Sequence, residues 1–173
     1  MIETTRLVIS ELALGDIEEA RVLHNEPETL KWLSDARVVS TSEQLKWFEN
    51  LQKSSSSKRY IARAKANNGL IGVFRFDNFD RQNSSAMVGL DIAVQFRQLG
   101  FAREIYEALL PYFFATFSLH RLSLITLENN SPAIQLYEGL GFKQEGILRE
   151  AVRRDKRFVN AIQYALLESD YEH

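Results

Sequence analysis

The sequence predicts a single mixed α/β domain, in which helices flank a twisted sheet that is mostly antiparallel. Strand-like runs follow one another between residues 60 and 94 with only short turns between them, which indicates an antiparallel meander. After residue 100 the pattern changes to helix, strand, helix and strand, which indicates a crossover with parallel pairing. The 173 residues are enough for one domain with a substantial core, expected over 1–173.

The composition is that of an ordinary globular protein. Hydrophobic residues make up 45% and charged residues 25%, and the formal net charge is −2. This small charge provides no general attraction for nucleic acid or an anionic membrane, so neither is expected as a partner. The chain has no cysteine, which excludes disulfides, thiolate metal sites and a cysteine nucleophile. Met1–Ser10 lacks the apolar stretch of a signal peptide and no run suits a membrane span, so we expect a cytoplasmic protein.

The first elements are expected to be a strand followed by helices. Alternating residues predict a strand over Arg6–Leu12, and Asp16 is expected to cap the helix that follows it. A short helical pattern surrounds Trp32. Thr41 and Gln44 have the spacing of a capping box and predict the start of a further helix.

The meander is expected to contain three strands. The first is predicted over Tyr60–Ala66, and Asn68-Gly69 is a strong hairpin turn signal after it. The partner strand is predicted over Leu70–Phe79, and a polar turn over 80–84 leads to the third strand, Ala86–Val94. Short turns of this kind join antiparallel neighbours.

The carboxy-terminal half is expected to alternate helices and strands before it ends in a hairpin. The predicted elements are a helix over Phe101–Phe117, a strand over Arg121–Glu128, a helix over Ser131–Leu140, and strands over Phe142–Arg153 and Phe158–Leu167 around the polar turn Arg154–Arg157.

The first candidate site is the segment RQLGFA, Arg97–Ala102, at the junction of a predicted strand and a predicted helix. A helix start offers unpaired N–H groups and a partial positive charge, which together suit a phosphate. Gly100 lets a backbone approach closely, Ala102 is small, and Arg97 and Arg103 add charge. The alternative is that Gly100 merely turns the strand into the helix. The spacing fits neither the dinucleotide fingerprint nor the P-loop.

The second candidate site is ENNSPAIQLYEGLGF, Glu128–Phe142. Ser131 and Pro132 suit the cap and first residue of a helix, on which Ala133 and Tyr137 share one face. Asn130 is predicted at the end of a strand, where ligands bind in open α/β sheets. Alternatively, Tyr137 belongs to the core and Asn130 is a turn residue.

Together these motifs resemble those of the GNAT superfamily of acetyl-CoA-dependent N-acetyltransferases. In that family a Gln/Arg-x-x-Gly-x-Gly/Ala loop holds the coenzyme A pyrophosphate, and the matching residues here are Arg97, Gly100 and Ala102. The second hallmark is Asn-x-x-Ala-x-x-x-Tyr followed by Gly-Phe, and it is matched by Asn130, Ala133, Tyr137, Gly141 and Phe142. Both ends of the chain resemble the branch that contains ribosomal-protein, spermidine and amino-sugar acetyltransferases.

The resemblance implies a splayed strand pair that holds acetyl-CoA as the co-substrate, without a metal. It implies that the Ile92 N–H stabilises the oxyanion, that Tyr137 donates a proton to the departing thiolate, and that Asn130 orients the coenzyme. The residues expected to bind the coenzyme are Ile92, Val94, Arg97, Gln98, Leu99, Gly100, Phe101, Ala102, Arg103, Asn130, Ala133 and Tyr137.

The chain departs from the family pattern in ways that leave the general base open. Several members carry a Glu where this chain has Ser85–Met87, and the carboxylates nearest the motifs are instead Asp91 and Glu128. Either is a candidate base for the acceptor amine. Gln98 stands where many members have a small residue, and Val94 where many have a proline.

The expected reaction is acetyl transfer to the primary amine of a small molecule, an amino-sugar nucleotide or a polyamine, or to a protein N-terminus. The segment His24–Leu51 is expected to line the acceptor side, where Trp32 and Trp47 either stack on a substrate or join the core. Its stretches HNEPE and EQLKWFENL resemble the amino-sugar acetyltransferases, which ranks an amino-sugar nucleotide slightly ahead of a polyamine. Its charges are interleaved, so no patch of one sign for a polyamine is evident. The alternatives are a non-catalytic acyl-CoA-binding sensor and an α/β interaction domain without a ligand. A monomer or a homodimer is expected.

Overall fold

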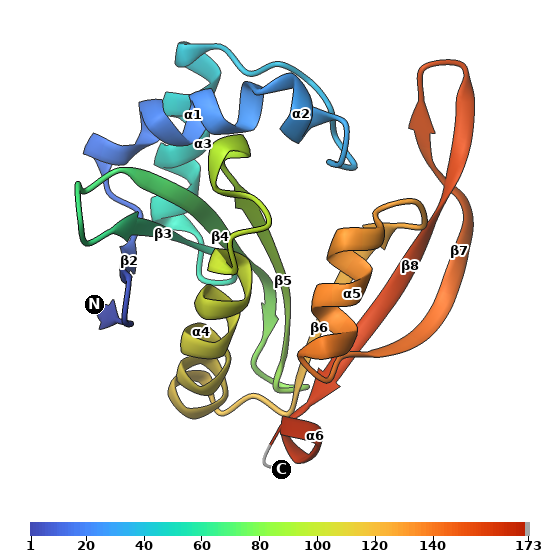
Figure 1. Ribbon diagram of the computed structural model, residues 1–173. Coiled ribbons are helices and arrows are strands. Elements are labelled where there is room, and N and C mark those ends of the chain that lie inside the picture. The colour runs from blue at the N-terminus through green and yellow to red at the C-terminus, as the bar shows by residue number, and fades with distance from the viewer. Residues whose placement is uncertain (172–173) are drawn as a thin grey trace.

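A computed structural model describes residues 1–171, and a twisted eight-stranded sheet forms its centre (Figure 1). The strand order is β1-β2-β3-β4-β5-β6-β8-β7, and every neighbouring pair is antiparallel except the parallel pair β5 and β6. The strands are β1 Ile2–Glu3, β2 Leu7–Glu11, β3 Lys58–Ala64, β4 Leu70–Asp80, β5 Ser85–Ile92, β6 Arg121–Leu127, β7 Lys143–Arg154 and β8 Arg157–Leu167. The predicted meander and crossover are confirmed. The predicted domain 1–173 also includes residues 172 and 173, which lie outside the described part.

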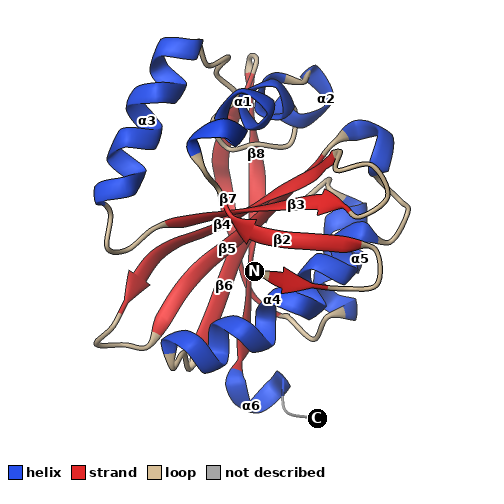
Figure 2. Cartoon of the chain, turned by 90° about the vertical axis from the view of Figure 1, so that its left-hand side faces the viewer, coloured by secondary structure: helices blue, strands red, loops and turns tan. Residues whose placement is uncertain are grey.

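Helices cover both faces of this sheet (Figure 2). They are α1 Ile17–Asn25, α2 Pro27–Leu30, α3 Thr41–Lys53, α4 Phe101–Phe117, α5 Ser131–Gly139 and α6 Glu168–Tyr171. The helices α4 and α5 pack in the main core, whereas α1 and α3 form a second cluster. None of the helices within residues 1–171 is long and apolar enough to cross a membrane.

Alternation along β4 sends its side chains to the two helical layers. Phe74 and Phe76 pack in the main core, where the ring of Phe76 stacks on that of Phe113 from α4 at 4.8 Å. Val73 packs in the second cluster with Phe48 of α3. Because successive side chains of a strand point to opposite faces, Arg75 lies on the α1/α3 face with Val73.

The strands β5 and β6 diverge, as the resemblance implies. They pair only where Ser85–Met87 faces Arg121–Ser123. Beyond that point β5 continues beside β4 as far as Ile92, whereas β6 pairs with β8 along its whole length. The ribbons therefore separate toward the carboxyl end of β5 (Figure 1).

The helix α3 begins with a capping box, one residue before the predicted one. The Ser40 hydroxyl accepts a hydrogen bond from the Glu43 N–H at 3.3 Å, and the Glu43 carboxylate accepts one from the Ser40 N–H at 2.8 Å. Ser40 has the extended backbone that a cap requires, whereas Thr41 is already helical. Gln44 instead points inward and donates to the Ile17 carbonyl at 3.3 Å.

The Asp16 carboxylate does not cap α1, which corrects a second prediction. It accepts a hydrogen bond from the Ala13 N–H at 2.9 Å and pairs with Arg63 at 2.8 Å. A 3₁₀ turn over Leu14–Asp16 precedes α1, so the aspartate closes that turn instead. The helical pattern near Trp32 corresponds to α2, which ends before the tryptophan, and the indole packs beside the β7–β8 hairpin.

We expect Ser40→Ala to lower the free energy of unfolding by about 1 kcal/mol, because the substitution removes the side-chain acceptor of the cap. Thr41→Ala is the matched control and should cost much less, since Thr41 makes no side-chain cap. Urea denaturation of both variants followed by circular dichroism measures the difference. Equal losses in the two variants would contradict the assignment of Ser40 as the cap.

Candidate functional site

The loop between β5 and α4 needs a glycine at one position. The strand ends at Ile92 and a 3₁₀ turn follows over Val94–Phe96, so the strand predicted to reach Val94 ends two residues earlier. Gln98 has a φ of +60° and Gly100 a φ of +81°, and Gly100 is the residue from which α4 starts. L side chains rarely adopt such backbone angles, which explains the glycine immediately before the helix.

The side of Gly100 where a Cβ would stand is open. Within 4 Å of that position the described residues place only an Nη atom of Arg6, at 3.5 Å. Arg6 donates to the Leu99 carbonyl at 3.0 Å, forms an ion pair with Glu104 at 2.6 Å, and lies 4.0 Å from the centroid of the Phe101 ring. Sequence reasoning missed Arg6, because 93 positions separate it from Leu99 and no local pattern links the two.

The start of α4 supplies hydrogen-bond donors beside this open space. The first N–H groups of a helix have no carbonyl of a preceding turn to bond, and the helix dipole adds roughly half a positive charge there. In residues 1–171 no hydrogen bond uses the N–H of Leu99 or Gly100. The loop can therefore hold an anionic group through its backbone.

Two arginines bind neighbouring elements here: Arg97 in the predicted loop and Arg103 just after it in α4. Arg97 donates from Nε to the Ile92 carbonyl at 2.9 Å and from Nη2 to the Thr29 hydroxyl at 2.7 Å. Arg103 donates to the Gly139 carbonyl at 3.1 Å, which joins α4 to the end of α5. These contacts fix the path of the loop between the two helical layers.

The N–H of Ile92 points toward the diverging strand β6. The Ala93 N–H donates to the Ile71 carbonyl on β4 at 3.0 Å. Consecutive N–H groups of a strand point to opposite edges, so the Ile92 N–H points away from β4. The carbonyl of Ile92 accepts from Arg97, so in the described residues its N–H is the group that Ile92 presents toward the gap between β5 and β6.

Asn130 is the cap of α5, so the prediction that Ser131 fills this role is wrong. The Asn130 Oδ1 accepts a hydrogen bond from the Ala133 N–H at 3.4 Å, and Ser131 is already the first helical residue. At the other end, Gly141 has a φ of +91° and its N–H donates to the Glu138 carbonyl at 3.0 Å. This stop fixes the length of α5 and thereby the orientation of its last turn.

Tyr137 is buried in the core at this last turn. Its ring centroid lies 5.8 Å from that of Tyr106 on α4 and 5.9 Å from that of Phe142. Burial is the main cause that raises the pKa of Tyr137, although the neighbouring Tyr106 hydroxyl and the charge of Arg75 oppose the rise. The phenol therefore stays protonated at neutral pH and is available as a donor. Tyr137 thus joins the core and keeps a protonated hydroxyl.

A cavity of about 430 Å³ lies on the α1/α3 face of the sheet. We call it the α1/α3 cavity. Its floor includes Arg59 of β3, Arg75 of β4 and Asp91 of β5. The segment predicted to line the acceptor side contributes its polar and aromatic wall: His24, Asp35, Arg37, Glu43, Gln44 and Trp47. Trp32 is not part of this lining.

The two candidate bases lie in different surroundings. The Asp91 carboxylate lines the α1/α3 cavity, is 14% exposed, and lies 3.3 Å from Nη1 of Arg75. Burial alone would lower the pKa of Arg75, but the nearby Asp91 carboxylate raises it above its usual value. Glu128 is exposed, accepts a hydrogen bond from Asn160 at 2.9 Å, and lies outside this cavity. Only Asp91 is therefore placed next to a space that can hold an acceptor.

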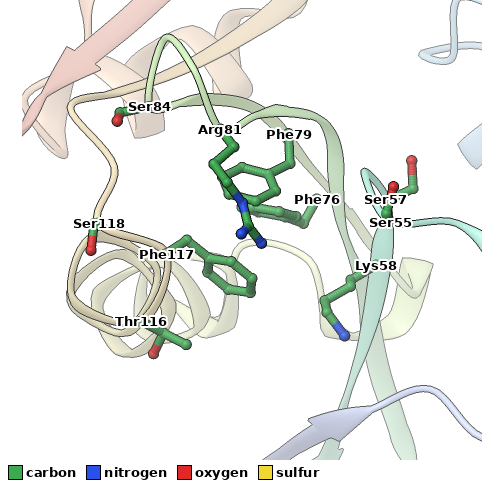
Figure 3. Close-up of a pocket in the computed structure, with 10 residues that line it drawn as sticks. All are labelled: Ser55, Ser57, Lys58, Phe76, Phe79, Arg81, Ser84, Thr116, Phe117 and Ser118. Atoms are coloured by element: carbon green, nitrogen blue, oxygen red, sulfur yellow. The ribbon is translucent and has the colours of Figure 1, made fainter.

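A second cavity, of about 500 Å³, lies at the far end of α4 (Figure 3). The rings of Phe76, Phe79 and Phe117 line it, the Arg81 side chain reaches toward these rings, and Lys58 lies across the cavity from them (Figure 3). None of the residues predicted for the site lines this cavity. The candidate site is therefore the region from the α4 start to the α1/α3 cavity.

Comparison with known proteins decides the family. Residues 6–143 match the acetyltransferase (GNAT) domain. The chain belongs to the GNAT acetyltransferases. This GNAT protein is an N-acetyltransferase, and acetyl-CoA is its acetyl donor. The resemblance drawn from the two motifs is thereby confirmed. The prediction of an acetyltransferase is favoured over that of an interaction domain without a ligand.

Similarity to known proteins extends over almost the whole of this GNAT chain. An uncharacterized N-acetyltransferase p20 of Bacillus licheniformis is 25% identical over 171 residues, which cover 97% of this chain and 96% of the relative. A spermidine N(1)-acetyltransferase of Vibrio cholerae is 25% identical over 167 residues, with 96% of each chain covered. The crystal structure of spermidine N-acetyltransferase from Vibrio cholerae with CoA and spermine superposes with a TM-score of 0.93 at 24% identity, over 98% of this chain and 100% of that one. The last comparison confirms the fold.

Proposed function

We propose that this enzyme transfers the acetyl group directly to the primary amine of a small molecule that enters the α1/α3 cavity. The observation that carries this proposal is the position of Asp91. This residue is the second-last of β5, and its side chain lines the cavity. The N–H of Ile92 and the loop at Gly100 follow along the same chain. An acceptor beside Asp91 therefore lies next to the expected path of the coenzyme.

The coenzyme is expected to lie where β5 and β6 diverge, with its pyrophosphate at the open side of Gly100. The backbone donors of Leu99 and Gly100 and the start of α4 supply the positive potential for it. The Ile92 N–H then faces the thioester carbonyl and stabilises the negative charge that develops on its oxygen. Tyr137 donates to the departing thiolate, and Asn130 helps to orient the coenzyme.

The acceptor must lose a proton before it attacks. An amine with a pKa near 10.4 is protonated at pH 7, and neutralising it costs about 4–5 kcal/mol. Asp91 accepts this proton, directly or through a water molecule, as a general base. Attack of the neutral amine on the thioester carbon forms the carbon–nitrogen bond and a tetrahedral intermediate, which collapses to the amide as the carbon–sulfur bond breaks. The nitrogen releases its second proton to solvent. Tyr137 gives its proton to the departing thiolate and takes one back from solvent.

The test is release of free thiol from acetyl-CoA with a panel of amines, namely an amino-sugar nucleotide, spermidine and an N-terminal peptide. We expect amine-dependent thiol release and a higher melting temperature with acetyl-CoA. The melting temperature reports coenzyme binding independently of the acceptor. A shift in melting temperature without thiol release from any primary amine would contradict the proposal and favour an acyl-CoA-binding sensor.

A substitution at the loop tests the place of the pyrophosphate. We expect Gly100→Val to raise the dissociation constant of acetyl-CoA at least about tenfold, because the new branched side chain fills the open side of the loop. Gly100→Asn separates this effect from backbone strain, since Asn tolerates a positive φ but still adds a side chain. Calorimetric titration should show weaker binding in both variants. Unchanged coenzyme affinity in either folded variant would contradict this placement.

A further inference from the structure

The α1/α3 cavity carries charges of both signs. Its lining includes three arginines, three carboxylates and one histidine: Arg37, Arg59, Arg75, Asp35, Glu43, Asp91 and His24. An acceptor with several ammonium groups needs carboxylates that are free to pair with them. The partners of these seven side chains therefore indicate which class of amine the cavity accepts.

The carboxylates of the cavity already have partners in the protein. Asp35 accepts from Nε of Arg37 at 3.0 Å and from Nη2 at 2.8 Å, a two-point ion pair. Glu43 accepts from the Ser40 N–H at 2.8 Å in the cap of α3. Asp91 lies beside Arg75 at 3.3 Å. A polyamine would have to displace these partners.

In residues 1–171, Arg75 is the cavity arginine whose N–H donors make no hydrogen bond. In residues 1–171 it has one ion pair, with Asp91, and no hydrogen bond, although a guanidinium has five N–H donors. By contrast, Arg59 donates to Asp77 at 2.7 Å and its side chain is only 13% exposed. The side chain of Arg75 is 35% exposed. Its unused donors are therefore accessible from the cavity.

Gly89 makes room for this guanidinium. Arg75 on β4 is the direct cross-strand partner of Gly89 on β5. A Cβ at position 89 would stand 2.7 Å from Nη2 of Arg75 and 2.8 Å from its Nε, closer than real contacts allow. The arginine thus lies against the β5 backbone, and a side chain at position 89 would occupy the same space.

We infer that the acceptor amine also carries an anionic group, a carboxylate or a phosphate, and that Arg75 binds it. This inference rests on the proposed acetyl transfer. The forked donors of a guanidinium match the two oxygens of a carboxylate or phosphate. Because Arg75 and Asp91 are neighbours, the anionic group and the amine of the acceptor lie close together in the bound molecule. A polyamine, which has no anionic group, is the disfavoured acceptor.

The test compares paired acceptors with and without the anionic group. One pair is an α-amino acid and its amide, and the other is an aminohexose and its phosphate ester. The wild-type enzyme should favour the anionic member of at least one pair about tenfold or more in kcat/KM. The pair that shows the preference identifies the group as a carboxylate or a phosphate.

Variants assign the preference to Arg75. Arg75→Gln should abolish it, so that the ratio of kcat/KM for the anionic member to kcat/KM for its neutral match falls to about one. This ratio isolates anion binding from the loss of the ion pair with Asp91, which affects both members equally. The KM for acetyl-CoA should change little. Arg75→Lys keeps the charge without the fork and should retain part of the preference. Gly89→Ala should displace the guanidinium while Arg75 is still present, and should also weaken the preference. This variant provides the test if Arg75→Gln does not fold.

Two outcomes would overturn the inference. If spermidine has the highest kcat/KM and Arg75→Gln lowers all acceptors alike, Arg75 only pairs with Asp91, and the proposed acetyl transfer still stands. If the wild-type enzyme uses the neutral and anionic members equally, no anion site operates here. Absence of thiol release with every amine is a different result, because it contradicts the proposed function and this inference with it.

Discussion

Asp91→Asn is expected to lower kcat/KM for the amine about 100-fold at pH 7, because it removes the proposed general base. Without a base, only the small neutral fraction of the amine reacts, and this fraction grows tenfold per pH unit below the amine pKa near 10.4. The loss should therefore shrink steadily as the pH rises. A structural defect would instead give a loss that does not depend on pH.

Glu128→Gln is the matched control, because Glu128 is the other carboxylate near the two motifs. It lies outside the α1/α3 cavity and bonds to Asn160, so its removal should leave the pH profile of kcat/KM unchanged. Steady-state kinetics from pH 6 to pH 9.5 with both variants measures the difference. A large loss in Glu128→Gln with none in Asp91→Asn would reverse the assignment of the base.

Local patterns were sufficient for the elements that frame the expected coenzyme site. The helix predicted over Phe101–Phe117 is found with those bounds, because its apolar periodicity is strong and a glycine precedes it. The two motifs are also local, since the residues of each lie within one loop and helix. Order and spacing along the chain were therefore enough to indicate the family.

The floor of the α1/α3 cavity could not be predicted in the same way, because it depends on strand register. Arg75 meets Gly89, and Asp91 meets Val73, only through the pairing of β4 with β5. Arg6 reaches the loop from a distant strand. No pattern within a short window contains these contacts, so the open donors of Arg75 become visible only in the fold.

Two of the three misplaced helix caps, those of α3 and α5, have one cause. Ser40 and Thr41 are neighbours that can each cap a helix, and so are Asn130 and Ser131. The residue that caps is the one with a non-helical backbone, and in both cases it is the earlier one. Residue type narrows a cap to two positions, whereas the backbone decides between them.

The role of the Tyr137 hydroxyl can be tested by a substitution that removes a single oxygen atom. Tyr137→Phe keeps the ring in its place between Tyr106 and Phe142 and removes only the donor. We expect kcat to fall about 100-fold, at the low end of general-acid effects, because a thiolate is already a fair leaving group. The dissociation constant of acetyl-CoA should change little, since the ring still fills the same space.

Tyr60→Phe is the control for the loss of a buried hydroxyl away from Tyr137. The Tyr60 side chain is 4% exposed and its hydroxyl has no hydrogen-bond partner within residues 1–171, so its removal should affect kcat much less. The raised pKa of Tyr137 adds a second check. Because the phenol keeps its proton as the pH rises, the wild-type kcat should not fall between pH 7 and the usual tyrosine pKa near 10. Equal kcat in Tyr137→Phe and the wild type at saturating substrates would leave Tyr137 a packing residue only.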